Sequence, residues 1–171
     1  MVKTWDRHRQ LEVAFPAPPE AVFAVLDDPA ALGAHMGERS SMMMGGKMTY
    51  GVDAAQGRAV GSVIRMEGSA LGLRLAVSEV VTERVPPMRK IWQTTGPQRM
   101  IVIAQYRMGF DITPTAEGCR VKMFIDYDLP ATGTGRLLGS IAGDKYAAWC
   151  LSQMAVSVRK HFAQVYADNS P

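Results

Sequence analysis

One change of pattern constrains the fold of this chain more than any other feature. From about residue 41 to 129, apolar side chains recur at every second position, which is typical of strands with one buried face. From Gly135 to about Tyr166 no proline interrupts the sequence, and apolar residues return at helical spacing. We therefore expect a sheet followed by one helix on the order of 45 Å long, enough to lie right across a twisted sheet.

The clearest alternation predicts two strands joined by a tight turn. In RMIVIAQYRMGFDIT (99–113) a strand is expected from Met100 onward, with Tyr106 and Met108 on its apolar face. The same alternation continues from Cys119 to Leu129 and places Met123 and Tyr127 on the apolar face. The intervening PTAEG favours a turn, so the two strands are expected to form an antiparallel hairpin.

Shorter segments complete the predicted order of elements. LEVAF (11–15) predicts a first strand, PAPPEAVFAVL a short helix, and the DDPAAL that follows a second short helix capped by an aspartate. Two strands are expected around Val60–Met66 and Leu71–Val77. A further strand carries Lys90, Trp92 and Thr94 on one face, with Trp92 directed inward.

The predicted C-terminal helix carries a broad apolar stripe. Leu138, Ala142, Tyr146 and Trp149 recur on one face, Leu137 and Ile141 widen that face, and Met154 lies further along the helix. This face is expected to pack on the sheet.

Glu79 allows two orientations. If the alternation of Leu71–Val77 continues without interruption, Glu79 points inward, where burial would raise its pKa and suit it to general acid or base chemistry. A bulge near Ser78 would instead turn Glu79 outward. The outward orientation is favoured here, because an unpaired carboxylate in an apolar interior is costly.

Length and charge limit the classes of function. The 171 residues suit one domain spanning residues 1–171, and the 19 basic and 16 acidic side chains are scattered. Nucleic-acid binding is not expected, because it requires clustered cations. The first ten residues are polar and no apolar run is long enough for a membrane span, so no integral membrane segment is expected. Together with widely spaced Cys119 and Cys150, which are expected to be buried thiols, this favours a cytoplasmic location. Both a monomer and a homodimer remain open.

No metal or cofactor is predicted. His8, His35 and His161 are far apart and have no cysteine or carboxylate cluster beside them, so they lack the spacing of a metal site. The glycines of GTGRLLG (133–139) are spaced differently from a dinucleotide-binding loop, and only 32 residues follow them.

The order of predicted elements resembles the helix-grip fold of the START-like superfamily, which includes polyketide cyclases, aromatases and lipid carriers. The resemblance rests on FPAPPEAVFAVLDDPAAL, GSVIRMEG, SEVVTERVPPMRKIW, GFDITPTAEGCRVKMFIDYDLP and the final helix. It implies an α+β fold in which a curved antiparallel sheet of about six to seven strands wraps around a long C-terminal helix, with two short helices after the first strand. It further implies a cavity between sheet and helix for an apolar or amphipathic small molecule.

The inward faces are rich in methionine and aromatic residues, which suits such a cavity. Methionine adapts its shape at little cost, while Tyr and Trp add hydrogen-bonding groups to an apolar wall. The candidate ligand-binding residues are Met66, Trp92, Tyr106, Met108, Met123, Tyr127, Tyr146, Trp149 and Met154. A solid core with a few polar tips remains the alternative.

Three functions remain open. The leading hypothesis is binding or carriage of a hydrophobic small molecule. The second is an enzyme of the cyclase, aromatase or dehydratase kind that uses pocket Tyr, Trp and Glu79. The third is a protein-interaction module that uses Met42, Met43 and Met44, since three consecutive methionines on a strand cannot all face one side.

Overall fold

The computed structural model describes residues 3–33, 47–70, 72–131 and 133–168. In chain order its elements are β1 (Arg7–Phe15), α1 (Pro19–Leu26), α2 (Pro29–Gly33), β2 (Lys47–Val52), β3 (Val63–Ala70), β4 (Leu73–Val85), β5 (Arg89–Thr94), β6 (Tyr106–Thr115), β7 (Gly118–Tyr127) and α3 (Gly133–Asp168). Within these ranges seven strands form one antiparallel sheet in the order β1-β7-β6-β5-β4-β3-β2. The predicted α+β helix-grip fold is confirmed.

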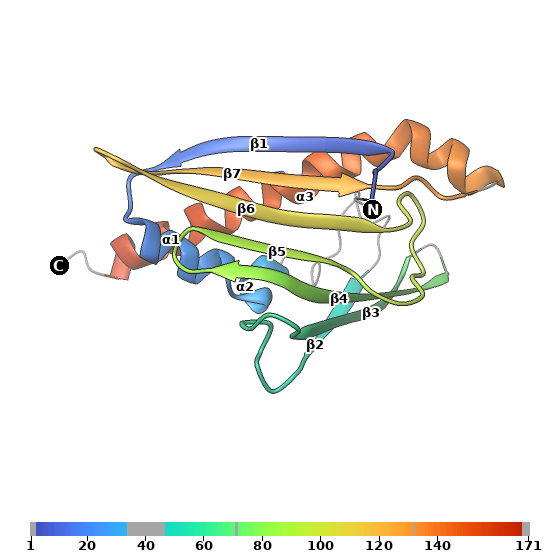
Figure 1. The fold of residues 1–171 in the computed structure, drawn as a ribbon, viewed down its shortest axis with the longest axis horizontal. Coiled ribbons are helices and arrows are strands. Elements are labelled where there is room, and N and C mark those ends of the chain that lie inside the picture. Colours follow the sequence, from blue (N-terminus) through green and yellow to red (C-terminus); the bar gives the residue numbers. More distant parts are fainter. Residues whose placement is uncertain (1–2, 34–46, 71, 132, 169–171) are drawn as a thin grey trace.

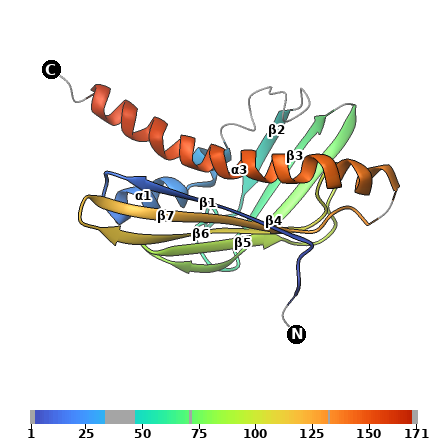
Figure 2. The same cartoon turned by 90° about the horizontal axis from the view of Figure 1, so that it is seen from above.

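The long helix α3 crosses one face of the sheet. Figure 1 shows α3 behind the strands, and the turned view in Figure 2 shows it running along the sheet while β2–β4 turn out of the plane of the other strands toward it. The closest contacts of α3 are with β1, β7, α1 and α2. The helix therefore packs on one half of the sheet and leaves space over the other half.

Local sequence explains the two short helices. Pro19 stands at the first turn of α1, where its missing N–H costs nothing, and Asp27 ends that helix. Oδ1 of Asp28 then accepts a hydrogen bond of 2.9 Å from the backbone N–H of Ala30, which caps α2. The predicted strand, helix and capped second helix are confirmed, and they leave Asp27 buried at the join.

The hairpin of β6 and β7 forms as predicted, but the strand from Met100 does not. Tyr106 pairs with Tyr127 and Thr115 with Gly118, so Ala116 and Glu117 make the turn. Regular pairing begins only at Tyr106, because residues 101–104 are irregular and bend instead of extending as a strand. Ile101, Val102 and Ile103 all contact the same cavity there, which a strand with alternating faces would not allow.

The buried face of α3 is only partly the predicted one. Ala147, Leu151 and Val158 are buried in the same cluster as the inward residues of β6 and β7. Leu137 and Ile141 are exposed, which contradicts their place on the packing face. The helix has 36 residues and a length of roughly 54 Å, so its first turns extend past the strands that could cover them.

Candidate functional site

A cavity of about 280 Å³ lies between α3 and the half of the sheet that α3 leaves uncovered. Its size is near the lower end of the ~300–1,000 Å³ range of small-molecule pockets. Most of its lining is Met, Leu, Ile, Val and aromatic side chains, contributed by α2, by β2 to β7, by residues 100–103 and by α3. The cavity therefore offers an apolar, adaptable wall to a guest.

The structure brings most of the predicted site residues to this wall. The six that line it are Met66, Trp92, Tyr106, Met108, Tyr146 and Met154. Met123 and Tyr127 are fully buried in the core beyond the cavity. Trp149 is half-buried and packs beside Tyr146 with ring centroids 5.8 Å apart. Met42, Met43 and Met44 lie outside the described residues.

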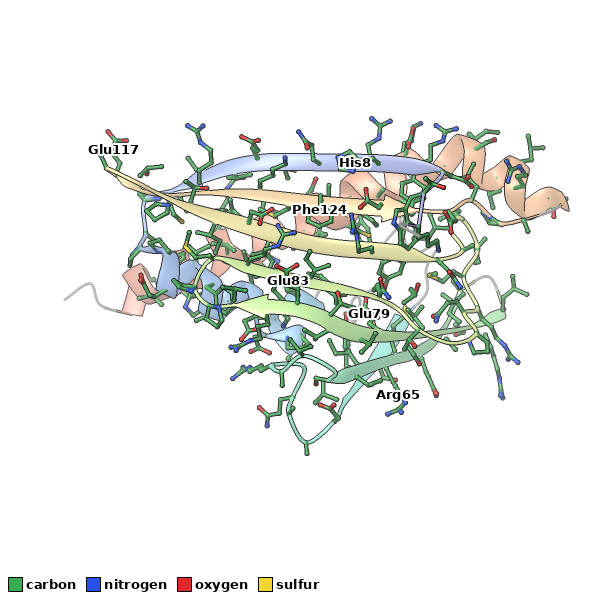
Figure 3. All side chains as sticks on the ribbon, in the orientation of Figure 1. His8, Arg65, Glu79, Glu83, Glu117 and Phe124 are labelled. Atoms are coloured by element: carbon green, nitrogen blue, oxygen red, sulfur yellow. The ribbon has the colours of Figure 1, made fainter. Side chains whose placement is uncertain are left out.

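Glu79 faces the cavity, so the prediction that it points outward is wrong. Val77, Glu79 and Val81 are all buried, as uninterrupted alternation requires. The irregularity in the pairing of β4 with β5 falls between Val81 and Glu83, beyond Ser78. Figure 3 labels Glu79 and Glu83 on β4, one on each side of this irregularity.

A hydrogen bond from Tyr106 partly offsets the cost of burying Glu79. The Tyr106 hydroxyl donates to Oε1 of Glu79. Burial raises the pKa of Glu79 to about 7, although hydrogen bonds from Tyr106 and Trp92 and the charge of Lys90 act in the opposite direction. A carboxyl group with this pKa can give or accept a proton at neutral pH.

Three further polar groups surround this carboxyl. Burial raises the pKa of Tyr106 and Tyr146 well above the usual tyrosine range, and the neighbouring Glu79 charge adds to the rise. Tyr50 shows the same direction for the same two reasons. Burial also raises the pKa of Cys150 to about 12, so its thiol stays protonated. These groups are therefore neutral polar groups near Glu79 at neutral pH.

A buried ion cluster lies at the inner end of the cavity, and sequence reasoning missed its role. Nζ of Lys90 donates to the backbone oxygen of Asp27 at 2.9 Å and to its Oδ1 at 2.8 Å. Arg84 donates to both carboxylate oxygens of Asp27, with Nη2 to Oδ2 at 2.7 Å. In the sequence, the alternation that places Lys90 on the same strand face as Trp92 already indicated that Lys90 points inward.

The pKa shifts in this cluster follow from burial and pairing. Burial alone would raise the pKa of Asp27, but hydrogen bonds from Arg84 and Lys90 together hold it below its usual value. Burial lowers the pKa of Lys90, and the bonds to Asp27 oppose that change. Removing one partner would leave an uncompensated buried charge, so the cluster is costly to break.

The cavity reaches the surface beside the first half of α3. Among its lining residues, Leu138 has 39% of its surface exposed and Lys145 is also exposed. Met100 and Ile101 line the cavity and are only half-buried. Figure 2 shows the start of α3 and the tip of β3 and β4 at the same end of the molecule. We expect a ligand to enter and leave the cavity at this end.

The described residues contain no cluster of three His, Cys, Asp or Glu side chains that could hold a metal ion. None of the helices in the described part of the chain is both long enough and apolar enough to cross a membrane. Cys119 and Cys150 are both buried free thiols, as predicted.

Solved structures with the same fold differ strongly in sequence from this chain. TTHA0849 from Thermus thermophilus has 20% identity and a TM-score of 0.67, over 96% of this chain and 100% of that one. MLL2253 from Mesorhizobium loti has 16% identity and a TM-score of 0.58, over 92% and 98%. Ara h 8.0201 has 9% identity and a TM-score of 0.59, over 90% and 98%. At these identities the likeness shows the fold alone.

Sequence comparison establishes the family. No curated protein matches the chain. Residues 8–155 match the family described as polyketide cyclase / dehydrase and lipid transport, a range that includes most of α3 and, apart from Arg7, the described strands. The chain therefore belongs to the polyketide cyclase / dehydrase and lipid transport family.

Proposed function

We propose that the protein binds and carries a hydrophobic small molecule in the cavity between the sheet and α3. The observation that carries this proposal is the enclosed apolar space itself, with Met66, Met108 and Met154 on its wall and an opening beside Leu138. A filled core would have no such space, because protein interiors normally pack to the density of organic crystals. Family membership supports the same class of function.

The test compares the unaltered protein with a variant whose cavity is filled, by their bound ligand and their dye binding. Purified protein is extracted into organic solvent for mass spectrometry and titrated with Nile red, an uncharged apolar dye. Val77→Phe adds volume inside the cavity, whereas Val60→Phe adds the same atoms at an exposed position. Saturable binding that is lost only in Val77→Phe is the expected result. An empty extract with no saturable dye binding in the unaltered protein would overturn the proposal.

A second candidate function is supported by the pairing of Glu79 with Tyr106. In an enzyme of the cyclase kind, ionised Glu79 would take a proton from the carbon between two carbonyl groups of a bound poly-β-carbonyl compound. The resulting enolate would attack a second carbonyl carbon and form a ring bond, and Glu79 would return its proton to the new alkoxide. A carboxyl with a pKa of about 7 in a largely apolar site suits both steps.

Turnover separates this candidate from simple carriage. Glu79→Gln and Tyr106→Phe both keep the shape of the wall and remove the acid–base pair. If the protein is an enzyme, both variants retain Nile red binding and lose conversion of a poly-β-carbonyl substrate. Unchanged conversion in Glu79→Gln would exclude this role for the carboxyl.

A further inference from the structure

The inner end of the cavity carries more positive than negative charge. Lys90 and Arg84 share the single carboxylate of Asp27. Arg58 also acts on Lys90 electrostatically, but Asp28 lies 3.5 Å from Arg58 and offsets it. Arg84 keeps 26% of its side chain in contact with solvent, so Lys90 is the cation of this pair that is held away from water. Burying such a charge is costly, so a further negative group is favoured nearby.

Lys90 presents this charge to the cavity. Only 2% of its surface is exposed to solvent, and the side chain lines the cavity wall. An ammonium group has three N–H donors, and two of them are used by the backbone oxygen and Oδ1 of Asp27. The described residues provide no third acceptor oxygen for it, and the nearest aromatic partner is the Trp92 ring, whose centroid lies 6.0 Å from Nζ. A ligand oxygen is well suited to fill this position, because a buried unsatisfied donor is unfavourable.

Glu79 is the other charged group in the enclosed part of the cavity. It is the one carboxyl group among the described lining residues, and the charge of Lys90 acts on it. The groups that face it are Tyr106 on β6, Trp92 and Lys90 on β5, Tyr50 on β2, and Tyr146 and Cys150 on α3. Without a ligand, the charge of Lys90 favours the ionised form of Glu79. A bound anion on Nζ of Lys90 would offset that charge and leave Glu79 facing a second negative group.

We propose that the cavity selects an amphipathic acid, with its apolar body against the methionine-rich wall and its anionic oxygen on Nζ of Lys90, and that binding is accompanied by proton uptake at Glu79. This inference rests on the proposed binding function and adds the chemical class of the ligand. A carboxylate, enolate or phenolate head supplies the required oxygen. An uncharged head on the same apolar body satisfies the buried ammonium less well. A cationic head is repelled by it.

Three compounds that share one apolar body test the selection. 2-Naphthoic acid, 2-naphthalenemethanol and 2-naphthylmethylamine are titrated by calorimetry at pH 8. The acid is expected to bind at least tenfold more tightly than the alcohol, and the amine most weakly. Equal affinities for acid and alcohol, or tighter binding of the amine, would overturn the inference and leave the binding function intact. If Nile red and all three compounds fail to bind, the binding function itself has failed.

Proton uptake is measured by repeating the acid titration in two buffers of different ionisation enthalpy. At pH 8 the expected uptake approaches one proton per bound acid. At pH 5.5 uptake is expected to be absent, because Glu79 is already protonated in the ligand-free protein. The affinity for the acid should therefore fall as the pH rises through 7, by up to tenfold per pH unit, while that for the alcohol stays constant. Uptake below a tenth of a proton at pH 8 would contradict coupling to Glu79.

Single substitutions test whether Lys90 causes the preference for the acid and whether Glu79 takes up the proton. Lys90→Met is expected to abolish the preference for the acid, whereas Lys122→Met makes the same change at an exposed position on β7 and is expected to retain it. Glu79→Gln should lose both the proton uptake and the pH dependence of acid binding. If Lys90→Met does not fold, the ratio of acid to alcohol affinity and the proton uptake of the unaltered protein still decide the inference.

Discussion

The hydroxyl of Tyr106, at the start of β6, donates a hydrogen bond to Glu79 on β4, so this bond spans the intervening strand β5. Thr94 of β5 provides a second link between these two residues. It is the register partner of Glu79, and its Oγ1 accepts a hydrogen bond of 3.2 Å from the backbone N–H of Tyr106. The carboxyl position is thus set by three strands, and its protonation is expected to affect both stability and ligand binding.

Stability should fall as the pH rises from about 5 to 8 because of Glu79. Burial raises the folded-state pKa to about 7, so in this range the folded protein retains a proton that the unfolded chain has lost. From an ordinary value near 4.3, this effect is on the order of 3 kcal/mol. Glu79→Gln should remove most of this slope and be more stable than the unaltered protein at pH 8, as measured by urea unfolding at several pH values. An unchanged slope in Glu79→Gln would refute the assignment.

Asp27→Asn should destabilise the protein strongly. The substitution removes the carboxylate that Lys90 and Arg84 share, and breaking a buried pair typically costs about 3–5 kcal/mol. Asp111→Asn is the matched control, because Asp111 pairs with Arg89 at a partly exposed site where an ion pair is worth about 0–1 kcal/mol. Both are measured by chemical unfolding at pH 7. Equal losses for the two variants would show that burial of the Asp27 cluster has little energetic consequence.

Asp144 should hold α3 onto the edge of the sheet. Its Oδ1 accepts from the Tyr127 hydroxyl at 2.5 Å, and its Oδ2 from Nη2 of Arg9 at 2.6 Å. Tyr127→Phe is expected to cost about 1–2 kcal/mol at pH 7. The Arg9 hydrogen bond, followed by that from Tyr127, holds the pKa of Asp144 below its usual value.

The Asp144 contribution is therefore present above pH ~4 and is lost as the pH falls through the lowered pKa. Asp144→Asn should lower the melting temperature at pH 7 and converge with the unaltered protein toward pH 3. A constant difference across this range would show that the charge of Asp144 is not involved.

Gly109 should not tolerate alanine. A Cβ at this position on β6 would lie 2.7 Å from the backbone oxygen of Lys90 and 3.0 Å from Cγ1 of Ile91. Overpacking of this kind typically costs about 1–3 kcal/mol. Gly51→Ala on β2 is the control, since nothing lies within 4 Å of its added Cβ, and a change within about 0.5 kcal/mol is expected there. Thermal unfolding of both variants provides the measurement, and equal stability would contradict the close approach at Gly109.

Leu138→Trp should slow ligand exchange. Leu138 lines the cavity where it opens, so a larger side chain there narrows the route without filling the interior. Both the association and the dissociation rate of Nile red should fall severalfold in stopped-flow experiments, with little change in Kd. Leu137→Trp is the neighbouring control, because Leu137 is 65% exposed and does not line the cavity. Slowing by Leu137→Trp alone would place the opening elsewhere.

The repeating pattern of the sequence determined the main elements of this fold. The hairpin of β6 and β7, the long helix and the aspartate-capped short helix all follow from spacing and capping within a few residues. Six of nine candidate residues line the cavity. Four of them lie on strands, where alternation assigns a face to each position, and Tyr146 and Met154 follow helical spacing on α3. These features depend on local geometry, which adjacent residues specify.

Only the tertiary structure decided the chemistry of the cavity. The orientation of Glu79 depended on where the irregularity of β4 falls, and pairing with β5 set that place beyond Val81. The Asp27–Lys90 contact joins residues 63 positions apart, which no local spacing reveals. Alternation shows which side of a strand is apolar, whereas the distance between sheet and helix depends on how all the elements pack together. That distance decides whether a cavity exists and which buried charges meet in it.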